Sequence, residues 1–235
     1  MRKLIPQLSA MSIVAWTAFS GALWAQENQV VVELYTSQGC SSCPPADALL
    51  HELAGRDDVI PLALHVDYWD YIGWKDSFAQ AKFTKRQKGY ARAGGWRTIY
   101  TPQMVINGAE DVVGSRPMKV TDLIRKHAKR APRVDLDVSR SGNTLRINAK
   151  SLAGSEPCDI HIVRYEPTEE VKITRGENSG RSLTYSHIVK DWQRVEQWNG
   201  QGTYSAKFSL KGLGPVVVIL QEPNHGAIVA AARLR

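Results

Sequence analysis

Two cysteines, Cys40 and Cys43, stand two residues apart and could carry out thiol–disulfide chemistry. The apolar run VVVEL (30–34) before them predicts a buried strand, followed by a loop over 36–39. The segment PPADALLHELAG (44–55) after them predicts a helix. The partial positive charge at a helix N-terminus stabilises a thiolate, which is the nucleophile in disulfide exchange. The spacing therefore predicts that Cys40 attacks a disulfide and that Cys43, one turn further in, resolves the mixed disulfide.

The segment YTPQMVING (100–108) gives a second signal. Pro102 cannot donate a hydrogen bond to a sheet, so it belongs at the start of the short strand predicted at 103–106. Asn107 and Gly108 favour a tight hairpin turn. The segment predicts a hairpin that begins just after Thr101 and Pro102.

Apolar periodicity places the other elements of the first half. It predicts a strand at 59–66 and helices at 75–92 and 120–130. The order in residues 26–131 is then β-α-β-α-β-β-α. From residue 132 onward short alternating strands are separated by turns, which predicts a small all-β sandwich-like domain over 132–235.

The stretches VVVELYTSQGCSSC and YTPQMVING, together with this order of elements, resemble the thioredoxin fold. The resemblance implies an α/β thioredoxin-like domain in which the proline before the third strand is cis and packs beside the cysteine pair. That position is Pro102 here, with Thr101 before it. The resemblance further implies thiol–disulfide oxidoreductase activity through Cys40 and Cys43, on protein or small-molecule disulfides.

One part of the thioredoxin pattern is missing. That family has a buried aspartate six residues before the first cysteine, where this chain has Leu34. Glu33 is adjacent but should point to the opposite face of the strand. Asp67, at the end of the second strand, is a candidate substitute.

A narrower resemblance covers nearly the whole chain after residue 25. The stretches ELYTSQGCSSCPPAD, HVDYWDYIGWKD, YTPQMVINGAEDVVGS and GENSGRSLTY resemble the bacterial secreted domain-of-unknown-function family 1223. This implies a thioredoxin-like half joined to a smaller β half, and it implies no particular substrate.

The N-terminus has the pattern of an export signal. Arg2 and Lys3 precede the apolar stretch AMSIVAWTAFSGALWA (10–25), with small residues near its end. We expect a signal peptide over 1–25 and a periplasmic or secreted mature protein, where disulfides persist. No later segment approaches the roughly 18 apolar residues that span a bilayer, so we expect no stable membrane insertion.

Two other functions use the same residues. His65 with the two thiols could bind copper or zinc, which would make the protein a metal-handling protein. Alternatively, the thioredoxin-like half could be a scaffold for a non-catalytic binding module. The sequence implies no organic cofactor. The expected partners are thiol- or disulfide-bearing proteins or small thiols. The net charge of +7 is spread along the chain, which does not favour nucleic-acid binding.

Three further features have open roles. The aromatic-rich segment HVDYWDYIGW (65–74) could form a lip for substrate or could pack a long loop. Cys158 fits a small buried apolar residue. The segment 174–187 predicts a long turn that could pack on the first half.

Overall fold

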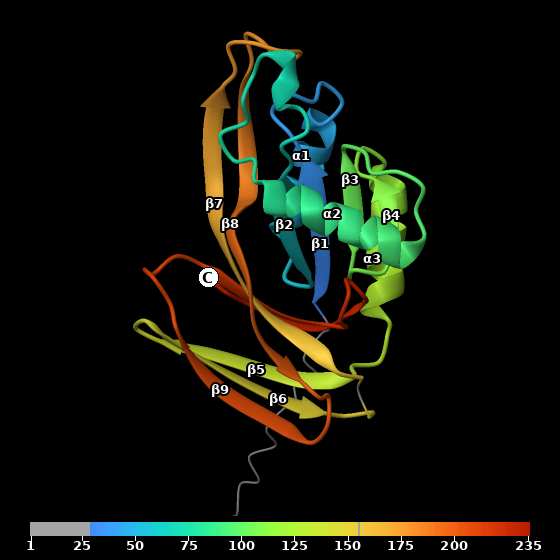
Figure 1. The fold of residues 1–235 in the computed structure, drawn as a ribbon, viewed down its shortest axis with the longest axis vertical. Helices are drawn as coiled ribbons and strands as arrows, with labels where there is room; N and C mark the ends of the chain where they lie inside the picture. The colour runs from blue at the N-terminus through green and yellow to red at the C-terminus, as the bar shows by residue number, and fades with distance from the viewer. Residues whose placement is uncertain (1–28, 155) are drawn as a thin grey trace, which may run out of the picture.

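The computed structural model describes residues 29–154 and 156–235, so the expected signal peptide over 1–25 lies outside the described residues. The chain forms an α/β structure around one mixed eight-stranded sheet, with a separate three-stranded sheet packed at one end (Figure 1). The strand order in the larger sheet is β11-β10-β7-β8-β2-β1-β3-β4, and in the smaller sheet β5-β6-β9.

The elements in chain order are β1 (Val30–Thr36), α1 (Pro44–Leu53), β2 (Val59–His65), the short 3-10 helix η1 (Asp70–Ile72), α2 (Ala81–Gly94), β3 (Gln103–Ile106), β4 (Glu110–Val113), α3 (Pro117–Ala128), β5 (Val134–Ser141), β6 (Thr144–Ser151), β7 (Cys158–Lys172), β8 (Ser182–Trp198), β9 (Thr203–Ser209), β10 (Val216–Gln221) and β11 (Ile228–Leu234). The first half follows the expected order β-α-β-α-β-β-α.

Strand β1 is the centre of the first half. It pairs in parallel with β2 and antiparallel with β3. Val32 and Leu34 face α1 and α3, while Val31 and Tyr35 face α2. Both faces of β1 are therefore covered, which explains why its sequence is a continuous apolar run and does not alternate. The buried strand delivers the segment that contains Cys40 to the start of α1.

The second half is joined to the first through the larger sheet. Strand β8 lies parallel to β2 through the pair Ala63 and Ile188, and β7 and β8 form a long hairpin beside the first half. The lower part of this hairpin, with β10 and β11, packs on the three-stranded sheet around a shared apolar core. The second half thus contains a sandwich. Its larger sheet also includes the strands β1 to β4 of the first half, so the boundary expected at residues 131 and 132 does not separate two sheets.

Three elements differ from the expectation. Strands β7 and β8, of 15 and 17 residues, replace the short strands expected in this part of the chain, and β8 begins within the long turn expected at 174–187. The helix expected at 75–92 begins only at Ala81. The physical reason is Asp76, whose side chain accepts hydrogen bonds from the amides of Gln38 and Phe78 and so holds this segment out of the helix. None of the described helices is long and apolar enough to cross a bilayer.

Candidate active site

Cys40 and Cys43 form a disulfide at the start of α1, with their Cα atoms 5.4 Å apart. Cys43 is the N-cap residue of the helix. Pro44 and Pro45 follow it and lack amide hydrogens, so the helix offers the sulfur atoms fewer free donors than other helix starts do. Cys40 is 1% exposed and Cys43 is fully buried. The disulfide therefore lies beneath other parts of the chain.

The loop before β3 lies next to the first turn of α1. The Thr101–Pro102 peptide bond is cis, as the resemblance implied. The amide of Gly114 donates to the Pro102 carbonyl at 2.9 Å, and a Cβ atom on Gly114 would stand 3.0 Å from Cβ of Ala46 in α1. Thus the structure brings Thr101 and Pro102 to the helix that carries the disulfide.

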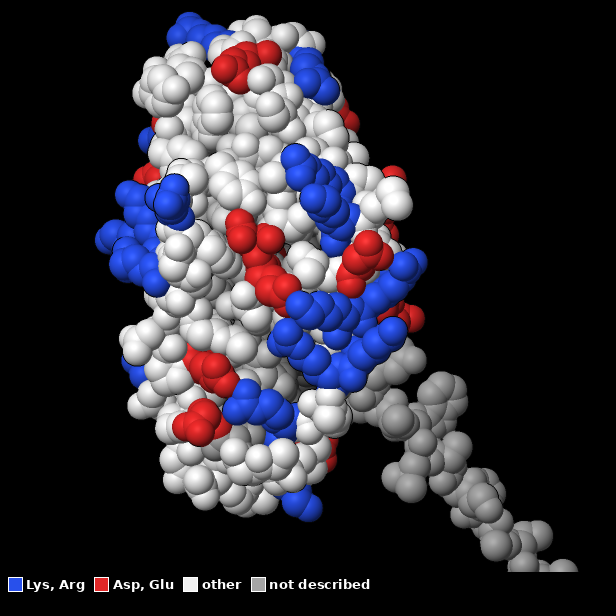
Figure 2. Space-filling view, turned by 90° about the vertical axis from the view of Figure 1, so that its right-hand side faces the viewer, with Lys and Arg blue, Asp and Glu red and all other residues white. Residues whose placement is uncertain are grey.

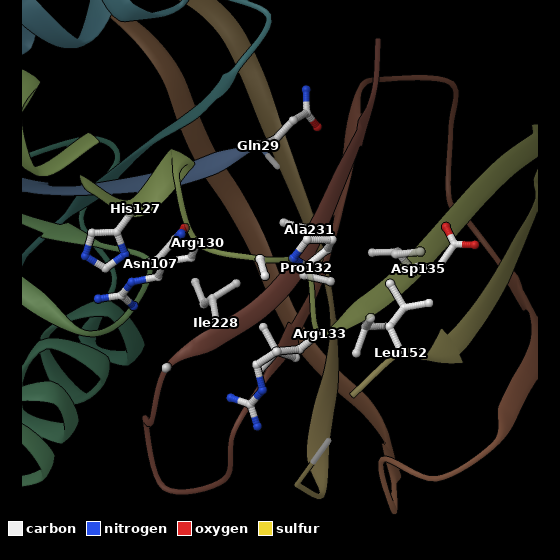
Figure 3. Close-up of a pocket in the computed structure, with 16 residues that line it drawn as sticks. Gln29, Asn107, His127, Arg130, Pro132, Arg133, Asp135, Leu152, Ile228 and Ala231 are labelled. Carbon is white, nitrogen blue, oxygen red and sulfur yellow. The ribbon is translucent and has the colours of Figure 1, made fainter. Parts of the chain in front are cut away.

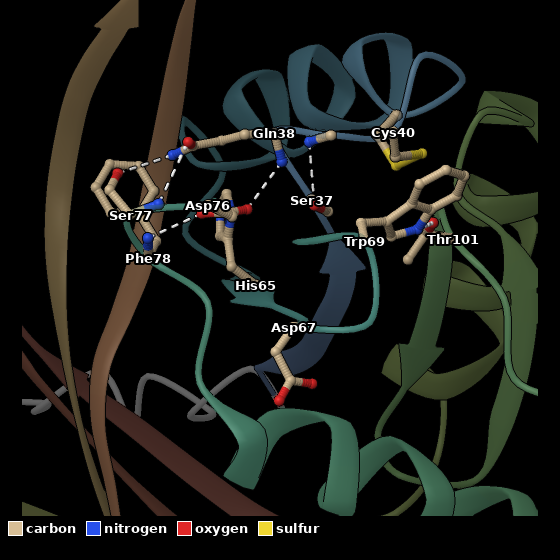
Figure 4. A network of polar contacts seen from close by, with 12 residues as sticks. Ser37, Gln38, Cys40, His65, Asp67, Trp69, Asp76, Ser77, Phe78 and Thr101 are labelled. Atoms are coloured by element: carbon tan, nitrogen blue, oxygen red, sulfur yellow. Dashed lines mark hydrogen bonds and ion pairs between the residues drawn. A yellow bond between two sulfur atoms is a disulfide. The ribbon is translucent and has the colours of Figure 1, made fainter. Parts of the chain in front are cut away.

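The aromatic segment, residues 68–74, covers the disulfide from one side. The indole N–H of Trp69 donates to the Thr101 hydroxyl at 2.8 Å, and Trp69 lies between Thr101 and Cys40 (Figure 4). A Cβ atom on Gly39 would stand 3.0 Å from Cδ1 of Ile72. Tyr71, by contrast, is 82% exposed. The segment therefore both packs over the site and presents one aromatic side chain to solvent.

The tip loop, residues 173–181 between β7 and β8, closes the other side. The Asn178 side-chain amide donates to the carbonyls of Gln38 and Cys40 at 2.9 and 3.0 Å. The Glu177 carboxylate accepts the amide N–H of Ser41 at 3.1 Å. This is the contact between the two halves that the segment 174–187 suggested. The individual roles of Glu177 and Asn178 were missed, although GENSG is rich in side chains that bind backbone groups.

A buried polar network supports the chain just before Cys40. Asp76 accepts the Gln38 amide at 2.8 Å and the Nδ1–H of His65 at 2.7 Å (Figure 4). Burial raises the pKa of Asp76, but His65 and the amides of Gln38 and Phe78 outweigh burial and keep that pKa below its ordinary value. His65 is thus oriented by a carboxylate.

The geometry gives little support to a metal site. Within 29–154 and 156–235 no group of three or more His, Cys, Asp and Glu side chains is arranged to hold a metal ion. In this state both site thiols are bonded to each other.

The two acids considered as substitutes for the missing aspartate have other partners. Arg86 donates to both oxygens of Glu33 at 2.7 and 2.8 Å, deep in the core. Asp67 accepts the Thr84 hydroxyl at 2.5 Å and is directed away from Cys40 in Figure 4. Neither carboxylate lies at the disulfide.

Cys158 is a free thiol buried in the core of the sandwich. Burial raises its pKa to about 11. Since the thiol form is unreactive, this cysteine is a packing residue, in line with its expected character.

A cavity of about 340 Å³ lies near the start of β1 (Figure 3). Its lining includes Gln29, which precedes β1, whereas Cys40 follows the other end of that strand. Arg130, Asp135 and Ile228 also line it. It contains none of the site residues predicted from the sequence.

The face of the molecule drawn in Figure 2 carries charged side chains of both signs. In Figure 2, Lys and Arg side chains gather over part of the surface, with Asp and Glu side chains beside them. On this face the basic side chains have acidic neighbours, in keeping with the spread of charge along the chain.

Comparisons with known proteins give a family but no activity. The sequence profile of a family described as "Protein of unknown function (DUF1223)" matches residues 31–221. The chain is also similar to the X-ray crystal structure of a protein from Agrobacterium tumefaciens, a structural genomics target. The identity is 34% and the TM-score is 0.77, over 89% of this chain and 96% of that chain. No curated protein matches the sequence.

Proposed function

This chain belongs to the DUF1223 family of proteins of unknown function, and we propose that it is a thiol–disulfide oxidoreductase that acts through Cys40 and Cys43. One observation carries the proposal: the two cysteines form a disulfide at the N-terminus of α1, next to the loop with the cis bond before Pro102. The disulfide is the oxidised half of a two-electron couple.

A thioredoxin-like first half is part of the proposal. It is supported by the order of elements, by the parallel pair β1 and β2, and by helices on both faces of β1. In such a site Thr101 and Pro102 would shape the surface that a substrate meets beside Cys40. The substrates would be disulfide- or thiol-bearing proteins or small thiols in the periplasm or outside the cell, after removal of residues 1–25.

The cover over the disulfide has a consequence for exchange. A thiolate must reach a sulfur atom along the axis of the S–S bond, and Cys40 is 1% exposed. Exchange therefore requires the aromatic segment or the tip loop to move. Both are held by a few hydrogen bonds, from Trp69 to Thr101 and from Asn178 to Cys40, so local opening can expose Cys40 without unfolding the sheet.

The test is to trap the exchange intermediate. The variant Cys43→Ser lacks the resolving thiol, so Cys40 should remain joined to its partners as mixed disulfides in cells. Non-reducing gels and mass spectrometry would identify them. Cys40→Ser is the matched control, because it keeps a thiol at the site but removes the proposed nucleophile. Cys158→Ala in each background removes any signal from the third cysteine.

Equilibration of the mature protein with glutathione buffers gives the direction of electron flow. A reduction potential near about −120 mV would make the protein a disulfide donor, and one near about −270 mV a reductase that needs an electron source. If no reversible disulfide between Cys40 and Cys43 forms and Cys43→Ser traps nothing, the proposal is wrong.

A further inference from the structure

Four buried side chains behind α1 carry polar atoms that have no hydrogen-bond partner among the described residues. These atoms are the Thr36 hydroxyl, both carboxylate oxygens of Asp47, Nε2 of His65 and the Tyr185 hydroxyl. Asp47 is 6% exposed and the other three at most 1%. Polar atoms without partners in a core destabilise the fold, so a group of them at one place needs an explanation.

The four side chains come from four elements that meet at this place. Thr36 is the register partner of His65 across β1 and β2. The rings of His65 and Tyr185 lie with centroids 5.0 Å apart. Asp47 of α1 interacts electrostatically with both His65 and Tyr185. Strand β8 of the second half supplies Tyr185, so this polar cluster is complete only when both halves are present.

The cluster reaches the disulfide through Asp47. The amide of Asp47 donates to the carbonyl of Cys43 at 3.1 Å, which places the two residues one helical turn apart. Residues four apart lie on the same helix face, and side chains of a helix lean toward its N-terminus. The carboxylate of Asp47 is therefore directed toward the turn that holds Cys43, and both side chains are buried there.

We propose that Asp47 accepts the proton of the Cys43 thiol during disulfide exchange, in a buried cluster that His65 and Tyr185 complete. This inference rests on the proposed exchange activity. Asp47 lies on the helix after the second cysteine. The aspartate of the thioredoxin pattern lies instead on the strand before the first cysteine, where this chain has Leu34. Neither Glu33 nor Asp67 takes this role, since Arg86 binds both oxygens of Glu33, and Asp67 accepts from Thr84 and is directed away from Cys40 (Figure 4).

The Cys40 thiolate attacks a substrate disulfide, forms a mixed disulfide and releases one substrate thiolate. Cys43 then passes its proton to Asp47 and attacks the Cys40 sulfur, which releases the second thiolate. The substrate gains two electrons and the protein dithiol loses two. A dithiol reductant reopens the bond at Cys40, and Cys43 leaves as a thiolate that takes the proton back from Asp47.

The pKa of Asp47 suits the role of proton acceptor for Cys43. Burial raises the pKa of its carboxyl group to about 7. His65 lowers that pKa and Asp76 raises it. The Thr36 hydroxyl faces the carboxyl group and also lowers its pKa, although it falls short of hydrogen-bond geometry. A proton acceptor works best when its pKa is near the pH at which it operates.

The experiment compares Asp47→Asn with the wild-type protein at the second chemical step. Each protein is reduced, mixed with a peptide that contains one disulfide, and quenched with acid at successive times. The loss of the mixed disulfide is measured from pH 5 to pH 9. We expect the wild-type rate to rise through about pH 7, and the variant to be slower by about ten-fold or more at pH 7. The variant rate should rise only toward the ordinary thiol pKa of about 8.5.

Asp67→Asn is the matched control and should keep the wild-type profile, because its carboxylate is held by Thr84. Equal rates and equal pH profiles for wild type and Asp47→Asn would overturn the inference. If the wild-type protein forms no mixed disulfide at all, the exchange activity itself is wrong, which is a different result.

A measurement on the unaltered protein covers the case in which Asp47→Asn does not fold. Carboxyl carbon NMR follows the titration of Asp47 in the oxidised and reduced states. We expect reduction to shift its midpoint, because a thiol then faces the carboxyl group. Identical titrations in the two states would contradict the inference.

Discussion

Asn178 donates its side-chain amide to the carbonyl of Cys40 at 3.0 Å across 138 residues of sequence. The same amide group donates to the Gln38 carbonyl at 2.9 Å. The residue belongs to the tip loop of the second half, and the cysteine to the first. The long hairpin of β7 and β8 thus positions the tip loop beside the disulfide.

Removal of this amide should open the site. In Asn178→Ala the carbonyls of Gln38 and Cys40 lose their donor, and we expect a loss of about 1–3 kcal/mol in the free energy of unfolding. Reduction of the disulfide by dithiothreitol should become several-fold faster, because the tip loop moves away more often. Ser179→Ala is the control from the same loop, since the Ser179 hydroxyl donates to the Thr174 carbonyl at the base of that loop. Equal reduction rates in all three proteins would show that the tip loop does not limit access.

The contact between Glu177 and Ser41 should make the access of a reductant to the disulfide depend on pH. The hydrogen bond from Ser41 lowers the pKa of Glu177 below its ordinary value of 4.5. A carboxylate with a lowered pKa is ionised and keeps its hydrogen bond at any pH above 4.5. It loses the hydrogen bond when the pH falls through the lowered pKa and the group takes up a proton. We expect disulfide reduction by a phosphine to accelerate below about pH 4.5 in the wild type relative to Glu177→Gln. A constant ratio of the two rates between pH 3 and pH 6 would contradict this.

How far the sequence predicts the structure depends on the range of the interactions involved. The strand expected at 30–34 and the helix after Cys43 follow from apolar runs and local signals, and both form, with the strand running on to Thr36. Strand β8 was missed because it is half-exposed over much of its length, so its sequence lacks a regular period. The helix expected from residue 75 starts late because Asp76 binds Gln38, a contact over 38 residues that no local pattern contains.

The site also contains residues that local sequence predicts and residues that only long-range contacts bring together. Spacing indicated the pair Cys40 and Cys43, and the resemblance indicated the cis bond before Pro102. Asn178 and Tyr185 reach the site only through the pairing of β8 with β2, and that pairing depends on the whole sheet. No local pattern singles out Asp47, because its burial depends on His65 and Tyr185, which come from other elements.

The burial of Asp47 should be visible in stability. The pKa of its carboxyl group rises from 3.8 to about 7 in the folded protein, mainly through burial. A group with a raised pKa contributes stability below its unfolded value, and this contribution is lost as the pH rises toward the folded value. The free energy of unfolding of Asp47→Asn, relative to that of the wild type, should therefore rise by up to about 1.4 kcal/mol per pH unit between pH 4 and 7. Above pH 7 this difference should stay constant. Urea unfolding at several pH values measures this. Parallel curves for the two proteins would contradict a raised pKa.

The close approach of Gly39 to the aromatic segment can be tested by adding one carbon atom. In Gly39→Ala the new Cβ would stand 3.0 Å from Cδ1 of Ile72 and 3.3 Å from Cβ of Trp69. The Ile72 side chain can rotate but the Trp69 Cβ is fixed to the backbone, so the segment must shift. We expect a loss of about 1–3 kcal/mol in the free energy of unfolding and faster reduction of the disulfide.

Two further variants show whether this contact is the cause. Gly55→Ala is the matched control, because its Cβ would meet only the Glu52 carbonyl at an ordinary 3.5 Å. Ile72→Ala combined with Gly39→Ala should recover part of the lost stability, since the smaller side chain makes room for the added carbon. The double-mutant cycle from urea unfolding then gives a coupling free energy of about 0.5–3 kcal/mol. Additive effects of the two substitutions would mean that Gly39 is required for a reason other than the packing of the aromatic segment over the disulfide.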